Sequence, residues 1–245
     1  GASWVARMGH AAVCFDDGIV TTTGGKDAGD TSLSDVQTTT SGGTALAVVA
    51  QNTFTRRQAH AIARVPGDAN AFLVVGGASS VTGTSMNDAM LTTNRGATFA
   101  QSNGVFTSRR SGSGLVATDA NSFVAFGGMK GGSILLNEVR RSIDSAVTWT
   151  TLRDDGPTSG DGTGGDSCAD KKMWSQRWMF GYAYMPWRKR ILLAGGSGSP
   201  EAWGSDDGGV CWQRLTADIS GSGTGFHAPS LVVALLSGIE ILILA

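Results

Sequence analysis

Short hydrophobic runs alternate along the chain with Gly-, Ser- and Thr-rich segments, and the alternation repeats. Runs such as FLVV, FVAF and ILLA are each closed by a Gly-Gly pair, and a second apolar run lies upstream of each pair. Four or five apolar residues bounded by turn residues are typical of buried β-strands. The pattern therefore predicts an all-β chain of short strands joined by tight turns. The pairs are Gly24-Gly25, Gly76-Gly77, Gly127-Gly128 and Gly195-Gly196.

Successive Gly-Gly pairs are 52, 51 and 68 residues apart, and a fifth apolar run, IEILILA, stands at the end of the chain. A period near 51 residues with four short strands per unit is the signature of a β-propeller, in which each repeat forms one four-stranded blade. We expect a single propeller domain over residues 1–245, with about five blades visible and with six or seven allowed in a longer protein. The expected blades span roughly 1–48, 54–102, 107–152, 175–216 and, incomplete, 224–245.

A second motif follows the Gly-Gly pairs. Residues 142–149 and 205–212 fit the pattern S-x-D-x-G-x-T-W, apart from Ala146 and Cys211, and residues 92–99 are a conservative variant. This turn resembles the Asp-box of sialidase-type propellers. The series Arg-x-x-His, strand, turn, strand, Gly-Gly resembles the kelch repeat of galactose-oxidase-type propellers, and together the two resemblances cover nearly the whole chain.

The turn motif is expected to have a structural role. Its Asp caps backbone N–H groups, its Gly supplies a positive φ, and its aromatic residue packs between neighbouring sheets. The residues assigned to this role are Asp144, Trp149, Asp207, Trp212, Asn94 and Phe99.

Composition excludes some classes of partner. The chain of 245 residues has a formal net charge of -1, which provides no general attraction for nucleic acid. The last 16 residues are apolar but shorter than the roughly 20 needed to cross a bilayer, and we interpret them as two buried strands rather than a membrane span.

The spacing of the three cysteines, Cys14, Cys168 and Cys211, does not match a zinc site. It leaves one disulfide open as an alternative.

One Gly- and Asp-rich insertion, residues 153–172, interrupts the repeat and is expected on the ligand-binding face. Its carboxylates suit a hard cation such as Ca²⁺, the one cofactor considered, but their spacing matches no EF-hand. A solvated, mobile loop is the expectation, with a calcium site as the alternative. The candidate ligands of that site are Asp154, Asp155, Asp161 and Asp166.

Recurring polar residues supply the candidate binding groups. One hypothesis places an arginine of each blade in an anion-binding ring at the channel mouth, beside Asp27 and Glu201 on the loops after the Gly-Gly pairs. The alternative is that each arginine pairs with the backbone or a carboxylate of a neighbouring blade, as repeat positions commonly do. His10, His60 and His227 recur similarly, and paired hydrogen bonding is preferred over metal binding for them. The arginines are Arg7, Arg57, Arg110 and Arg177.

These observations favour a non-enzymatic binding or structural module. We expect it to contact other protein subunits or a glycan through its loop-bearing face, in a secreted or cell-surface setting and as one component of a larger extracellular assembly. The alternative is a sialidase-like or other glycan-active glycoside hydrolase. Sialidase-like propellers need an arginine triad, a tyrosine with a glutamate partner, and an aspartate acid/base. Tyr182 and Tyr184 lie in an expected first strand, where packing is their expected role, and we assign no catalytic residue.

Overall fold

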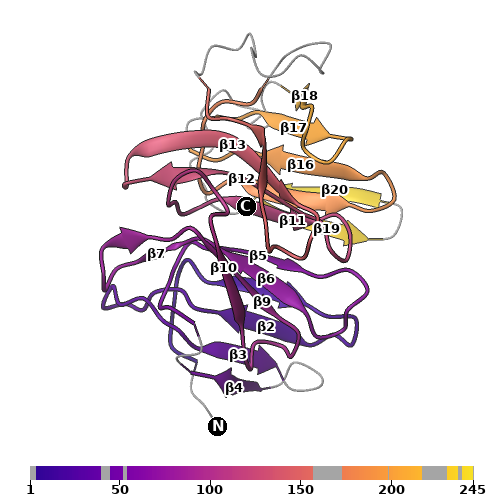
Figure 1. The fold of residues 1–245 in the computed structure, drawn as a ribbon. Coiled ribbons are helices and arrows are strands. Elements are labelled where there is room, and N and C mark those ends of the chain that lie inside the picture. The colour runs from indigo at the N-terminus through magenta and orange to yellow at the C-terminus, as the bar shows by residue number, and fades with distance from the viewer. Residues whose placement is uncertain are drawn as a thin grey trace.

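A computed structural model describes residues 4–39, 45–51, 54–156, 173–197, 199–216, 231–236 and 239–244. Every regular element in these segments is a β-strand. The strands form four antiparallel four-stranded sheets and two hairpins, arranged as the blades of a propeller (Figure 1). The prediction of an all-β propeller with four-stranded blades is confirmed. No helix in the described segments is long and apolar enough to cross a membrane.

The strands follow one another from the inner to the outer edge of each blade. Blade 1 contains β1 (Ala11–Cys14), β2 (Val20–Thr23), β3 (Val36–Thr39) and β4 (Leu46–Ala50). Blade 2 contains β5 (Ala61–Arg64), β6 (Phe72–Val75), β9 (Asp88–Thr92) and β10 (Ala100–Asn103). Blade 3 contains β11 (Gly114–Ala117), β12 (Phe123–Lys130), β13 (Ile134–Ser142) and β14 (Thr150–Arg153). Blade 4 contains β15 (Gly181–Met185), β16 (Arg190–Ala194), β17 (Ala202–Ser205) and β18 (Gln213–Thr216).

Two hairpins complete the fold. The short strands β7 (Ala78–Ser79) and β8 (Thr84–Ser85) form a raised hairpin between the second and third strands of blade 2. The strands β19 (Leu231–Leu236) and β20 (Ile239–Leu244) pair with each other beside blade 4. First strands of successive units are neighbours, β1 with β5, β5 with β11, β11 with β15 and β15 with β19, so they surround a common axis.

The core lies between the blades. Side chains along a strand alternate between its two faces. In β6, Phe72 and Val74 belong to the cluster shared with blade 1, whereas Leu73 and Val75 belong to the cluster shared with blade 3. In blade 3, Val124 and other β12 residues face blade 4 in the same way. Because both faces of an inner blade are covered, its second strand is a continuous apolar run, as the sequence shows.

The Gly-Gly pairs follow β2, β6 and β16 directly, and in blade 3 the pair lies inside β12 at a shift of register. Both glycines of each pair have positive φ, for example 60° at Gly76 and 103° at Gly77. A Cβ on Gly77 would lie 2.9 Å from the carbonyl oxygen of Gln58, and one on Gly128 would lie 2.9 Å from that of Ser111. Backbone conformation therefore favours glycine at both positions, and the second position also lacks space for a side chain.

Candidate functional site

The repeated arginines are buried, and each uses the same contacts in its own blade. Arg57, Arg110 and Arg177 are 0% exposed. The Nη1 of Arg57 donates to the carbonyl of Gly76 at 2.8 Å, and its Nε donates to the carbonyl two residues earlier, that of Thr55. Equivalent bonds join Arg7 to Gly24 and Val5, Arg110 to Gly127 and Ser108, and Arg177 to Gly195 and Ser175.

A carboxylate at the start or in the middle of the third strand completes each arginine site. Arg7 makes two bonds to Asp35 at 2.7 and 2.8 Å, and Arg57 makes two to Asp88, both at 2.8 Å. Arg110 pairs with Glu138, which is also 0% exposed. Arg177 lies 3.2 Å from Glu201. The pairing of these acids with the arginines was not predicted from the sequence, although each acid lies 24 to 31 residues after its arginine.

These contacts bear on the hypothesis of an anion-binding arginine ring. The guanidinium groups donate to carbonyls and carboxylates inside the blades, and burial lowers the pKa of Arg177 to about 10 against the opposing effect of Glu201. An aromatic ring lies near each guanidinium, from Trp4, Phe54, Phe106 and Trp174. The arginines are paired, as in the alternative, but with groups of their own blade rather than of a neighbouring one, and ligand binding by them stays a prediction.

A belt of backbone hydrogen bonds crosses from blade to blade two residues after each arginine. We call the residues there, Gly9, Ala59, Gly112 and Met179, the axial residues. All four have positive φ, between 50° and 63°. The N–H of Ala59 donates to the carbonyl of Gly9 at 2.8 Å, that of Gly112 to Ala59 at 2.7 Å, and that of Met179 to Gly112 at 3.0 Å. The belt fixes the loops that precede the first strands.

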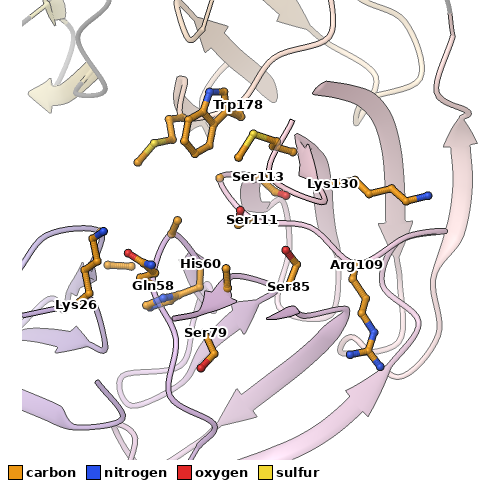
Figure 2. Close-up of a pocket in the computed structure, with 18 of the residues that line it drawn as sticks. Lys26, Gln58, His60, Ser79, Ser85, Arg109, Ser111, Ser113, Lys130 and Trp178 are labelled. Carbon is orange, nitrogen blue, oxygen red and sulfur yellow. The ribbon is translucent and has the colours of Figure 1, made fainter. Parts of the chain in front are cut away.

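A cavity of about 1780 Å³ opens above this belt, lined by residues of all four blades. The loops before the first strands and those after the Gly-Gly pairs form its walls, including the β7–β8 hairpin. That hairpin is joined to blade 1 because Ser32 and Ser80 each donate a backbone N–H to the other's hydroxyl, at 2.8 and 2.9 Å. Figure 2 shows the cavity with polar side chains from several loops around it. We take this cavity as the candidate site.

The charged side chains that line the cavity are all basic: Lys26, Arg109 and Lys130. No Asp or Glu is among its described lining residues. Lys26 lies 2.5 Å from Asp30, whose side chain is 70% exposed. Arg109 and Lys130 are exposed. Figure 2 shows Lys26 at one side of the cavity and Arg109 with Lys130 at the other.

Two side chains at the base of the cavity have unusual surroundings. His60 is 7% exposed, and its Nε2 lies 2.8 Å from the hydroxyl of Thr23, whereas its Nδ1 has no partner in the described structure. Burial, with the charge of Arg57, lowers the pKa of His60 to about 3, so the ring is neutral. Burial raises the pKa of Tyr182 to about 12, and its hydroxyl is hydrogen-bonded to the backbone of β5 and β11. Tyr182 thus links its own strand, β15, to the first strands of blades 2 and 3.

The remaining acidic candidates lie apart from the cavity lining. Asp27 accepts bonds from the backbone of Gly29 and Thr31, which shapes its own turn. Asp155 accepts bonds at 2.8 Å from the backbone N–H groups of Asn137 and Glu138. Two of the four predicted calcium ligands, Asp161 and Asp166, lie outside the described residues, and so does His227 of the recurring histidines. Within the described residues, no group of three His, Cys, Asp or Glu side chains has the arrangement of a metal site.

The three complete turn motifs share one hydrogen-bond pattern between the third and fourth strands. In blade 3 the hydroxyl of Ser142 donates to Asp144, which accepts the N–H of Thr148 at 2.9 Å. The corresponding acceptors are Asp207 for Cys211 N–H at 2.8 Å and Asn94 for Thr98 N–H at 2.9 Å. The aromatic residues Trp149, Trp212 and Phe99 pack in the clusters between blades.

Two of the cysteines differ in their state. Cys211 is disulfide-bonded, and Cys14 is free and exposed.

Comparison with known proteins adds no relative. The chain matches no protein-family model, and no curated protein is significantly similar to it. The proposed function therefore rests on the fold and the cavity.

Proposed function

We propose that this propeller is a non-enzymatic binding module whose ligand occupies the cavity formed by the loops of blades 1 to 4. The observation that supports this is the lining itself: hydroxyl and amide groups, three basic side chains and the partly buried Trp178 surround one large open cavity. Ligand sites commonly combine a concave surface with a few polar groups that fix orientation. A glycan or a protein segment fits this description.

The proposal places the carboxylates in structural rather than catalytic roles. A glycoside hydrolase requires two carboxyl groups on either side of the scissile bond. Glu138 and Glu201 are instead paired with buried arginines, and Asp27 accepts bonds from its own turn. This distribution favours binding over hydrolysis.

We further propose that the repeated turns are Asp-boxes and the repeats kelch-like, in a secreted or cell-surface protein. The shared bonding of Asp144, Asp207 and Asn94 supports the first part. The disulfide at Cys211 supports an oxidising compartment, because disulfides are rare in the cytosol.

The binding function is tested by blocking the cavity. Thr84→Trp adds a large side chain on the exposed β7–β8 hairpin that lines the cavity. Ala120→Trp adds the same side chain at the exposed β11–β12 turn, outside the lining, and serves as the control. Against panels of immobilised glycans and peptides, we expect Thr84→Trp to weaken retention of any bound ligand about tenfold, which is a loss of roughly 1.4 kcal/mol. Ala120→Trp should retain binding.

Two results would contradict the proposal. Equal loss in both variants would place binding elsewhere. Hydrolysis of a glycosidic substrate that Thr84→Trp abolishes would make the cavity an active site, and the sialidase-like alternative would replace the binding function.

A further inference from the structure

We infer that the ligand of the cavity is a polyanionic glycan, an oligosaccharide with carboxylate or sulfate groups on at least two of its sugar residues. This inference rests on the proposed binding function and names the ligand class for that site. Its basis is the sign and placement of the charges, the hydroxyl groups of the lining and the aromatic surface.

The basic side chains stand in two places rather than one. Lys26 follows the Gly-Gly pair of blade 1, whereas Arg109 and Lys130 belong to the loops of blade 3. The β7–β8 hairpin of blade 2 separates these blades, and Figure 2 shows the two basic groups on opposite sides of the cavity. Lys26 is paired with the exposed Asp30, but exposed ion pairs are weak and a ligand anion can compete for the ammonium. A ligand with a single acidic group contacts only one of the two sides, so the arrangement favours at least two anionic groups on an extended molecule.

The charges on the blade 3 side are available to a ligand. Arg109 and Lys130 are exposed, and neither side chain has a hydrogen bond or ion pair with another described residue. This contrasts with the adjacent Arg110, which is buried against Glu138. A guanidinium binds planar carboxylates and sulfates through paired N–H donors, and an ammonium adds a compact positive charge.

The neutral part of the lining suits sugar hydroxyls. Ser79, Ser85 and Ser111 place hydroxyl groups, which both donate and accept, along the wall. Trp178 offers a partly buried aromatic face, and sugar rings pack their C–H faces on such surfaces. An acidic peptide has fewer groups that can both donate and accept a hydrogen bond. A glycan therefore matches these serine hydroxyls better.

His60 contributes to the cavity wall through its ring rather than through a free nitrogen. Its imidazole is more than nine-tenths buried and lines the cavity. The Nδ1 atom has no hydrogen-bond partner in the described structure and is itself enclosed by protein, so it is not a contact for the ligand.

Binding of defined probes tests the inference. The probes are a heparin-derived hexasaccharide, an oligogalacturonate of the same length, neutral cellohexaose and a poly-glutamate peptide, measured by calorimetry. We expect the two anionic glycans to bind and their affinity to fall as salt is raised, because exposed charge contacts are screened. The double variant Arg109→Gln/Lys130→Gln should weaken both about tenfold, and Lys26→Gln should weaken them less but measurably.

A matched control separates a site from general attraction to polyanions. Lys189→Gln removes the same charge from the exposed β15–β16 turn, outside the cavity lining, and should leave affinity unchanged. Equal losses in Lys189→Gln and the cavity variants would overturn the inference, as would poly-glutamate binding as tightly as the glycans.

The outcomes also distinguish this inference from the function on which it rests. One outcome is that cellohexaose binds and the anionic probes do not. If its affinity then falls in Trp178→Ala and is unchanged in the charge variants, the cavity binds a neutral glycan. In that case the inference fails and the binding function stands. If folded protein binds no glycan or peptide in the cavity, both proposals fail. Thermal unfolding of each variant confirms that the fold is retained.

Discussion

At the residue scale, four arginines connect the Gly-Gly turn, the preceding loop and the third strand of each blade. The Arg110 pair shows what this requires, since guanidinium and carboxylate are both 0% exposed. Taking two charges out of water is costly, and mutual hydrogen bonding offsets that cost only when both partners are present. The surrounding contacts to Gly127 and Ser108 use the remaining donors of the guanidinium.

We predict that Glu138→Gln lowers the free energy of unfolding by about 3 kcal/mol, because it leaves the buried Arg110 with only the partly exposed Asp155, at 3.5 Å, as a counter-charge. Asp206→Asn removes one partner of the exposed pair between Arg190 and Asp206 and should cost less than about 1 kcal/mol. Denaturant unfolding of both variants measures the difference. A small effect of Glu138→Gln would show that the carboxylate contributes little to stability.

At the scale of elements, hairpins and turns position the site. The axial residue, two positions before each first strand, takes a left-handed conformation, even where it is Ala59 or Met179. In blades 2 to 4 its N–H reaches the preceding blade. The strands themselves follow from alternation of side chains between two covered faces. The Gly-Gly pair then allows the second strand to pass close to the loop that carries the arginine.

We predict that Gly77→Ala destabilises the protein by more than Gly67→Ala does. Both glycines have positive φ, 103° and 80°, so alanine strains the backbone at each by about 1 kcal/mol. Gly67 has open space around it, whereas a Cβ on Gly77 meets Gln58 and His60 at 2.9 Å. Overpacking adds about 1–3 kcal/mol at Gly77, which thermal or chemical unfolding will show. Equal effects would mean that conformation alone selects glycine there.

At the scale of the whole molecule, stability resides between blades. The three apolar clusters each join two neighbouring blades, and the turn of one blade packs on the blade before it, as where Arg153 donates to the carbonyl of Val210 at 2.8 Å. His60 adds a polar contact of this kind, because its ring joins blade 2 to Thr23 of blade 1. Protonation of this ring therefore affects the contact between blades 1 and 2.

We predict that stability falls as pH is lowered from about 6.5. The pKa of His60 is lowered to about 3 in the folded state, so between these values the unfolded chain binds the additional proton and is favoured. This one group contributes a slope of up to about 1.4 kcal/mol per pH unit. Unfolding measured from pH 5 to 6.5 tests this above the range in which carboxylates such as Asp144 affect stability, which runs from the unfolded pKa of about 4 down to the folded value of about 2.

His60→Gln should flatten that pH dependence, because the amide does not titrate in this range. His10→Gln is the matched control, since His10 has a lowered pKa from partial burial but lies in a more exposed place. An unchanged slope in His60→Gln would assign the acid sensitivity to other groups.

The strands, the Gly-Gly turns and the all-β class could be predicted from the amino-acid sequence, because each depends on residues close to one another in the chain. The repeat period could be predicted because the Gly-Gly pairs recur at a regular spacing. The pairing of Arg57 with Asp88, 31 residues away, could not, since the separation varies with loop length and the acid is Asp in two blades and Glu in two. Only the tertiary structure brought Lys26, His60, Arg109 and Lys130 around one cavity. Their positions there are set by how blades pack about an axis, which no local pattern specifies.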